Sequence, residues 1–125
     1  MPSRGQLKDA ISKAMIKFEK EYLGRGPEEV KTFILGDLIL VRLRGILTPA
    51  ERHLANDDEG RMLIKQVRIQ LIEKSRSLLE GIVHEITGRR VVSLHTDIST
   101  VTGERVFLFV LDQEIDSESE ADRAY

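Results

Sequence analysis

The most constraining feature of this sequence is a long stretch of helical periodicity that ends at a glycine. Apolar residues recur three or four positions apart, and Ser75 fills the one gap in their stripe. This spacing predicts a single amphipathic helix from Arg61 to Thr87, with Gly88 at the position where helices commonly end. The apolar members of the stripe are Leu63, Ile64, Val67, Leu71, Leu78, Leu79, Ile82, Val83 and Ile86.

The length of this helix bears on how the chain assembles. At 1.5 Å per residue it spans ~40 Å, whereas a compact domain of 125 residues has a radius of gyration of only ~14 Å. The helix is therefore about as long as the body it belongs to. Either it bends near Gly81, or one end packs against a second copy of the chain. The sequence favours a homodimer.

The segment before the long helix contains a shorter helix and a pair of strands. Apolar residues at helical spacing predict a helix from Leu7 to Tyr22, which Gly24 ends. Val30 to Leu35 and Leu38 to Arg44 are typical of strands, and Gly36-Asp37 between them favours a tight hairpin turn. A single bent strand is the alternative. In the second strand, Arg42 and Arg44 share one face.

Two further signals complete the predicted order of elements. Thr48-Pro49-Ala50-Glu51 combines an N-cap, a proline at the first helical position and a capping-box glutamate, which predicts a short helix from Pro49 to about Asn56. Arg90 to Thr96 and Arg105 to Leu111 are the last two strands, and the latter is apolar on both faces, as in an interior strand. The fold class is therefore α+β, with the order α-β-β-α-α-β-β. We expect a four-stranded, mostly antiparallel sheet with one long and two shorter helices packed on one face.

Composition separates a folded body from an acidic tail. Residues 112–125 carry six acidic residues and one basic residue, a net charge of −5, whereas residues 1–111 carry a net charge of +3. We therefore expect a single α+β domain over residues 1–111 and a disordered tail over residues 112–125. The chain contains no cysteine, which excludes disulfides and thiolate metal sites and fits a cytoplasmic location. No apolar run approaches the ~20 residues of a spanning helix, so we expect any membrane role to be exercised through a partner.

The residues that could carry chemistry do not form a recognisable catalytic set. His95 and Asp97 lie two apart on a predicted strand and share a face, but a metal site needs a third ligand. Ser93 and Ser99 lie near His95 without the sharp turn and oxyanion-hole glycines of a nucleophile site. Gly24-Arg25-Gly26-Pro27 follows a helix and lacks the lysine of a phosphate-binding loop. We expect no enzymatic activity, no metal and no cofactor.

A basic sheet face is the best candidate for a binding site. If the faces that carry Arg42 with Arg44 and His95 with Asp97 fall on the same side of the sheet, they form a groove for a small anion or for a partner's acidic segment. The simpler alternative is a solvated sheet face. Nucleic-acid binding would need a more basic and more aromatic surface, so we expect no nucleic acid as a partner.

Several short segments, taken in this order, carry a family resemblance that runs from about Leu7 to Leu111. They are Gly24-Arg25-Gly26-Pro27, Ile34-Leu35-Gly36-Asp37, Leu43-Arg44-Gly45-Ile46-Leu47-Thr48-Pro49-Ala50-Glu51, Leu94-His95-Thr96-Asp97-Ile98-Ser99-Thr100 and Thr102-Gly103-Glu104. With these segments the chain resembles the bacterial MpsC-type domain family, which is named for a sodium-translocating, membrane-potential-generating system. The resemblance implies a cytoplasmic, non-enzymatic accessory or regulatory protein of a cation-coupled membrane transport system, with a transporter subunit as possible partner. It supplies no catalytic residues. A small-anion sensor is the alternative function, and a nucleic-acid-binding module is the third.

Overall fold

The computed structural model describes residues 2–115, and these form helices and strands in the predicted order. The α+β class and the sequence α-β-β-α-α-β-β are thereby confirmed. The elements are α1 (Arg4–Leu23), β1 (Glu29–Leu35), β2 (Leu38–Arg44), α2 (Pro49–Leu54), α3 (Asp58–Thr87), β3 (Val91–Ser99) and β4 (Glu104–Leu111).

The four strands form one sheet in the order β1-β2-β4-β3, and every neighbouring pair is antiparallel. β1 and β2 form the predicted hairpin, with Gly36 in its turn at a φ of 63° that favours glycine. β4 lies in the interior, as its apolar character on both faces predicted. β3 is longer than predicted and runs to Ser99, because its ladder with β4 continues until Ser99 pairs with Glu104.

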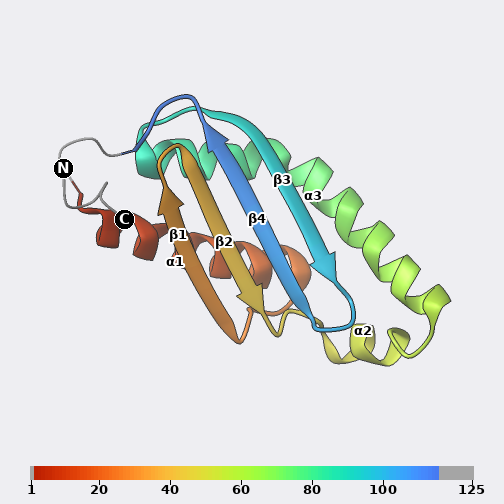
Figure 1. Cartoon of the computed structure of the whole chain (residues 1–125). Coiled ribbons are helices and arrows are strands. Elements are labelled where there is room, and N and C mark those ends of the chain that lie inside the picture. The colour runs from red at the N-terminus through yellow and green to blue at the C-terminus, as the bar shows by residue number, and fades with distance from the viewer. Residues whose placement is uncertain (1, 116–125) are drawn as a thin grey trace.

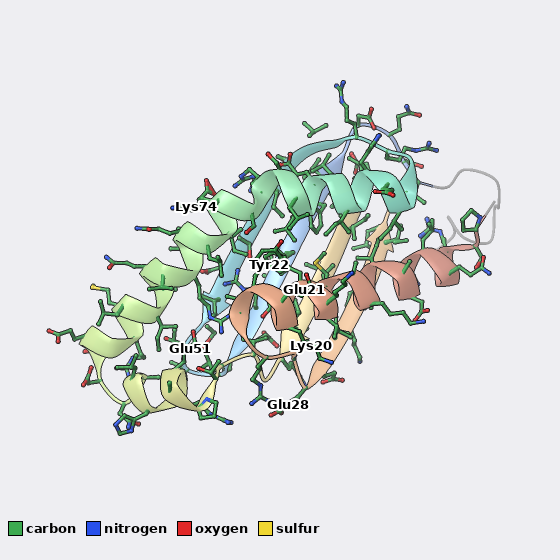
Figure 2. The ribbon with its side chains drawn as sticks, turned by 180° about the vertical axis from the view of Figure 1, so that it is seen from behind. Lys20, Glu21, Tyr22, Glu28, Glu51 and Lys74 are labelled. Atoms are coloured by element: carbon green, nitrogen blue, oxygen red, sulfur yellow. The ribbon has the colours of Figure 1, made fainter. Side chains whose placement is uncertain are left out.

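The helices and the sheet form two layers. α1 and α3 lie side by side behind the sheet and cover one of its faces (Figure 1). The described residues leave the other face uncovered. α2 lies at the end of the sheet rather than across its face, packed against the beginning of α3. Figure 2 shows the molecule from behind, where α1 and α3 lie in front of the strands.

Alternation along the strands determines which side chains enter the core. In β2, Ile39, Val41 and Leu43 are fully buried beneath the helices, whereas Arg42 and Arg44 point to the uncovered face. Each buried aliphatic side chain contributes about 1.5–3 kcal/mol through the removal of apolar surface from water. The helices supply the facing layer of the core with Leu7, Ile11, Met15 and Phe18 from α1 and Ile64, Ile72, Leu79 and Val83 from α3.

The ends of the long helix have clear local causes. α3 begins at Asp58, three residues before the predicted start, because the carboxylate of Asp57 caps it by accepting a 2.7 Å hydrogen bond from the Gly60 N–H. It ends at Gly88 as predicted, where a φ of 72° lets the N–H donate back to the carbonyl of His84. With 30 residues, α3 is ~45 Å long.

Residues 112–115 pack against the domain, although they lie beyond the predicted domain boundary at Leu111. The Asp112 carboxylate accepts a 3.1 Å hydrogen bond from the Arg90 N–H, and Ile115 is buried in the core cluster. Residues 116–125, which make up most of the predicted acidic tail, lie outside the described residues.

Candidate anion-binding pocket

The structure places the four predicted site residues on the same, uncovered face of the sheet. β4 lies between the two pairs, because Arg42 and Asp97 both pair with Val106, one from each side. Strands are spaced by about 4.8 Å, so the pairs are about 10 Å apart at the backbone. His95 contacts the hydroxyl of Ser93 at 3.1 Å. The strand register therefore shows that the two polar faces lie on the same side of the sheet. Their use as a binding site stays a prediction.

A cavity lies beside one of these pairs. Arg42 and Arg44 line a hollow of about 830 Å³ at the end of the sheet, where β2 leads into α2. Two arginines that sequence reasoning did not single out, Arg52 on α2 and Arg61 on α3, also line it. The turn between β3 and β4 supplies a third wall. We refer to Arg42, Arg44, Arg52 and Arg61 with this hollow as the arginine pocket.

Glu104 partly neutralises the sheet side of the arginine pocket. One of its carboxylate oxygens accepts a 2.6 Å hydrogen bond from Arg42 Nε and a longer one, 3.5 Å, from Arg44 Nε. Arg44 also pairs with Glu29 at 3.4 Å on the neighbouring strand. The guanidinium groups of Arg42 and then Arg44 lower the pKa of Glu104 below its usual value. The site thus already holds one anionic oxygen between two guanidinium groups.

The helix side of the arginine pocket is less neutralised. Arg61 donates to the carbonyl of Ala55 at 2.7 Å and pairs with the exposed carboxylate of Asp58. Arg52 forms no ion pair and no side-chain hydrogen bond with any residue that the structure describes. The position of Arg52 is determined by α2, whose first turn is closed by the predicted capping box between Thr48 and Glu51.

A buried ionic cluster lies behind the arginine pocket, and sequence reasoning missed it. Arg68 of α3 is 1% exposed and makes a two-pronged contact with Glu51 through Nε at 2.9 Å and Nη2 at 2.6 Å. Its Nη1 lies 3.6 Å from Glu19 of α1, an ion-pair distance without a hydrogen bond. Arg105 of β4 completes the cluster and donates to the hydroxyl of Thr96 at 3.0 Å.

Burial dominates the electrostatics of this cluster. It raises the pKa of Glu19, although Arg105 and Arg68 act in the opposite direction. It lowers the pKa of Arg105 to about 10. For Glu51 burial is outweighed, since the hydrogen bonds from Arg68 and Thr48 hold the pKa of this carboxyl below its usual value. Both Glu19 carboxylate oxygens lack a hydrogen-bond donor, so this acid is the least satisfied member of the cluster.

The cluster and the arginine pocket are formed by neighbouring residues of the same elements. Glu51 points to Arg68, whereas the next residue, Arg52, lines the pocket. Glu104 lines the pocket, whereas Arg105 enters the cluster. Figure 2 shows Glu51 at the α2 end of the molecule, close to α3. The pocket walls are therefore held in place by the ionic contacts behind them.

Two apolar surfaces remain uncovered by the described residues. The sheet-face patch lies on β1, β2 and β4, and it consists of Phe33, Leu35, Leu38, Leu40, Val106, Leu108 and Val110. The α3 patch lies on the first half of α3, and it consists of Met62, Leu63, Val67 and Ile69, which are 49–65% exposed. Large uncovered apolar patches are typical of surfaces that bind other proteins.

Residues 2–115 contain neither a cluster of metal ligands nor a membrane-spanning helix. No three His, Cys, Asp or Glu side chains of this part of the chain gather closely enough to hold a metal ion. Among the helices described, none combines the length and the apolar character that crossing a membrane requires.

The fold and these surfaces define a small α+β domain with an arginine-lined pocket at one end of its sheet. The chain belongs to the MpsC family, whose description is "Na+-translocating membrane potential-generating system", and the family model matches residues 3–113. The uncharacterized protein YbcI of Bacillus subtilis (strain 168) is 47% identical over 118 residues, covering 94% of this chain and 95% of the relative. The uncharacterized protein YrhF of the same strain is 34% identical over 107 residues, covering 84% and 87%. No solved structure gives a significant match.

Proposed function

We propose that this chain is a non-enzymatic accessory protein of a cation-coupled membrane transport system and works on the cytoplasmic side of the membrane. The observation that carries the proposal is the family match over residues 3–113, because the family is described by a sodium-translocating system. On this proposal the chain is peripheral to the membrane and reaches it by binding a transport subunit.

The sheet-face patch supports a role in binding such a subunit. It is apolar over three adjacent strands, and Phe33 and Leu35 at its edge are 40% and 55% exposed. Charged residues border it at one end, where Lys31, Arg42 and Arg44 lie in neighbouring rows. An apolar centre with a polar border is the usual composition of a protein–protein interface.

The test is recovery of the partner from native cells in mild detergent and low salt, with the tagged protein as bait and mass spectrometry as readout. We expect the wild-type chain to recover a polytopic transport subunit and Phe33→Asp to lose it. Leu78→Asp is the matched control, because Leu78 is 42% exposed and lies on the helix layer. Recovery of the chain alone, or of nucleic acid, contradicts the proposal.

A small-anion sensor is the second candidate function, and the arginine pocket favours it. Its lining carries four arginines against two glutamates, Glu28 and Glu104. An anion that stabilises the folded chain would raise its melting temperature. We expect this rise to vanish in the double variant Arg42→Ala with Arg44→Ala, and an unchanged rise in that variant would end this candidate.

We also propose that the protein is a homodimer and that a second copy covers the α3 patch. The beginning of α3 exposes apolar side chains in addition to its buried stripe, since Ile64 points to the core while Met62 and Val67 point to solvent. Exposed apolar residues grouped on one element are typical of a surface that another protein covers. A second copy of the same helix offers a surface of the same composition, as twofold symmetry requires.

A further inference from the structure

The charge of the arginine pocket identifies the kind of ligand that it can hold. Its lining has a formal net charge of +2, and Arg52 has no carboxylate partner within the described chain. Arginine binds phosphate and carboxylate oxygens through paired, planar N–H donors. Glu29 and Asp58, just outside the lining, offset Arg44 and Arg61, so Arg52 is the least neutralised of the four arginines. Two pairs of guanidinium groups, one on β2 and one on the helices, suit a ligand with two anionic groups.

Glu104 shows how an anionic oxygen is held in the pocket. Arg42 and Arg44 come from alternate positions of β2, and their Nε atoms converge on the same Glu104 oxygen at 2.6 and 3.5 Å. An incoming anion would compete with this carboxylate for the two guanidinium groups. Removing the charge of Glu104 would therefore favour the ligand.

The volume and the lining residues of the hollow restrict the class of ligand further. A volume of about 830 Å³ lies within the range of about 300–1,000 Å³ that is typical of sites for small organic molecules, and it far exceeds the space that a single inorganic anion fills. Thr100, Thr102 and Asn56 add uncharged polar groups, and no aromatic side chain lines the hollow. The lining is therefore suited to anionic and hydroxyl groups rather than to a stacked base.

We propose that the arginine pocket binds a small, non-aromatic compound that bears two phosphoryl groups, with Arg52 and Arg61 as ligand contacts in addition to Arg42 and Arg44. The inference rests on the anion-sensor function proposed above and names the class of ligand for that site. Because α2 carries Arg52 and α3 carries Arg61, the ligand would bridge the helices to the sheet. The position of α2 would thereby report occupancy of the pocket.

The experiment is calorimetric titration of the full chain with inorganic pyrophosphate as the probe of paired phosphoryl groups. We expect wild-type protein to bind pyrophosphate more tightly than orthophosphate, and we expect Arg52→Ala to weaken pyrophosphate binding by about tenfold or more. Arg90→Ala is the matched control, since Arg90 is exposed and lies outside the pocket. Equal affinities of the Arg52 and Arg90 variants would overturn the proposal, because binding would then reflect overall charge.

A second pair of variants tests the competition by Glu104. Glu104→Gln should bind pyrophosphate more tightly than wild type, by about threefold or more, because the substitution releases Arg42 and Arg44. Glu85→Gln removes the same charge from the exposed far end of α3 and should leave the affinity unchanged. A loss of affinity in Glu104→Gln would overturn the proposed competition.

Citrate separates failure of the ligand class from failure of the sensor function. Binding of citrate that depends on Arg52, without binding of pyrophosphate, would overturn the phosphoryl class and leave the anion sensor standing. Absence of binding for both probes at millimolar concentration would overturn the sensor function as well. ATP is the third probe, and binding of ATP much tighter than that of pyrophosphate would contradict the non-aromatic ligand.

Discussion

Arg68 is the residue on which the charge balance of the interior depends. It lies between two acids from different helices and pairs with both, Glu19 of α1 and Glu51 of α2. Its side chain also donates a 3.2 Å hydrogen bond to the carbonyl of Ile46. At 1% exposure it has no access to water that could replace these contacts. Removing one partner from a buried ionic group leaves the other charges uncompensated, which costs far more than losing a surface pair.

We therefore expect Arg68→Met to lower the free energy of unfolding by about 3–5 kcal/mol. Lys13→Met is the control, because Lys13 pairs with Asp9 at the exposed surface of α1, where an ion pair contributes about 0–1 kcal/mol. Urea unfolding followed by circular dichroism measures both values. Similar losses in the two variants would show that the buried cluster contributes no more than a surface pair.

Glu19 gives stability a dependence on pH that is opposite to the usual one for an acid. Burial raises the pKa of Glu19 above the ordinary value of 4.5. Its contribution to stability is therefore fully present below the unfolded pKa and is lost as the pH rises through the folded pKa. Glu19→Gln does not ionise, so we expect this variant to gain stability relative to wild type as the pH is raised from 4 to 7. A difference that is constant over this range would contradict the raised pKa.

Glu51 provides the opposite case within the same cluster. Although burial opposes ionisation, the hydrogen bonds from Arg68 and Thr48 keep the pKa of Glu51 below 4.5. Its contribution is present above the unfolded pKa and is lost as the pH falls through the folded pKa. We expect the stability deficit of Glu51→Gln to be largest near neutrality and to shrink in acid. Thermal unfolding at a series of pH values checks this, and a deficit that grows in acid would refute it.

At the scale of elements, α2 is held to the body by a small number of specific contacts. One is the Glu51–Arg68 pair, and another is the close approach of Gly60, where an added Cβ would lie 1.7 Å from the backbone oxygen of Leu54. Only glycine lets α2 fold back onto α3 at this distance. The arginine pocket depends on the same approach, because Arg52 and Arg61 lie on either side of it in the chain.

We expect Gly60→Ala to displace α2, to lower the free energy of unfolding by about 1–3 kcal/mol and to weaken pyrophosphate binding. Gly81→Ala is the control, since nothing lies within 4 Å of the added Cβ at this helical position. The control should raise the free energy of unfolding by about 0.5–1 kcal/mol, because alanine favours the helix over glycine. Wild-type affinity in the Gly60 variant would show that α2 does not position the pocket.

The elements themselves could be predicted from local signals. Periodicity gave the long helix, the capping box placed α2, and the alternation in β2 correctly separated Arg42 and Arg44 from the buried Ile39. The arginine pocket could not be predicted, because Arg52 and Arg61 meet β2 only through tertiary packing. One signal for the buried cluster was present: Arg68 continues the buried stripe four residues after Ile64 and four before Ile72. A charged residue on an apolar stripe indicates a buried partner.

At the scale of the whole molecule, part of α3 is left uncovered by the rest of the described chain. The helix is ~45 Å long, and its first half extends past the sheet beside α2 (Figure 1). The second half of α3 packs on the core of the domain, where Leu79 and Val83 are fully buried. The first half instead exposes Met62 and Val67 at 65% and 63%. The length of the helix and the uncovered α3 patch lead to the same proposal of a second copy.

We expect wild-type protein to elute at twice the chain mass of 14.2 kDa in size-exclusion chromatography with light scattering, and Val67→Glu to elute at the mass of one chain. A glutamate in the centre of an apolar interface loses its hydration without gaining a partner, which opposes association.

Val92→Glu is the matched control, because Val92 is also 63% exposed but lies on β3, outside both apolar surfaces. Since association stabilises the fold by mass action, the melting temperature should rise with protein concentration for wild type and Val92→Glu, and stay constant for Val67→Glu. Equal masses and equal concentration dependence in the two variants would place the dimer interface elsewhere, whereas a monomeric wild type would leave the α3 patch free for the transport subunit.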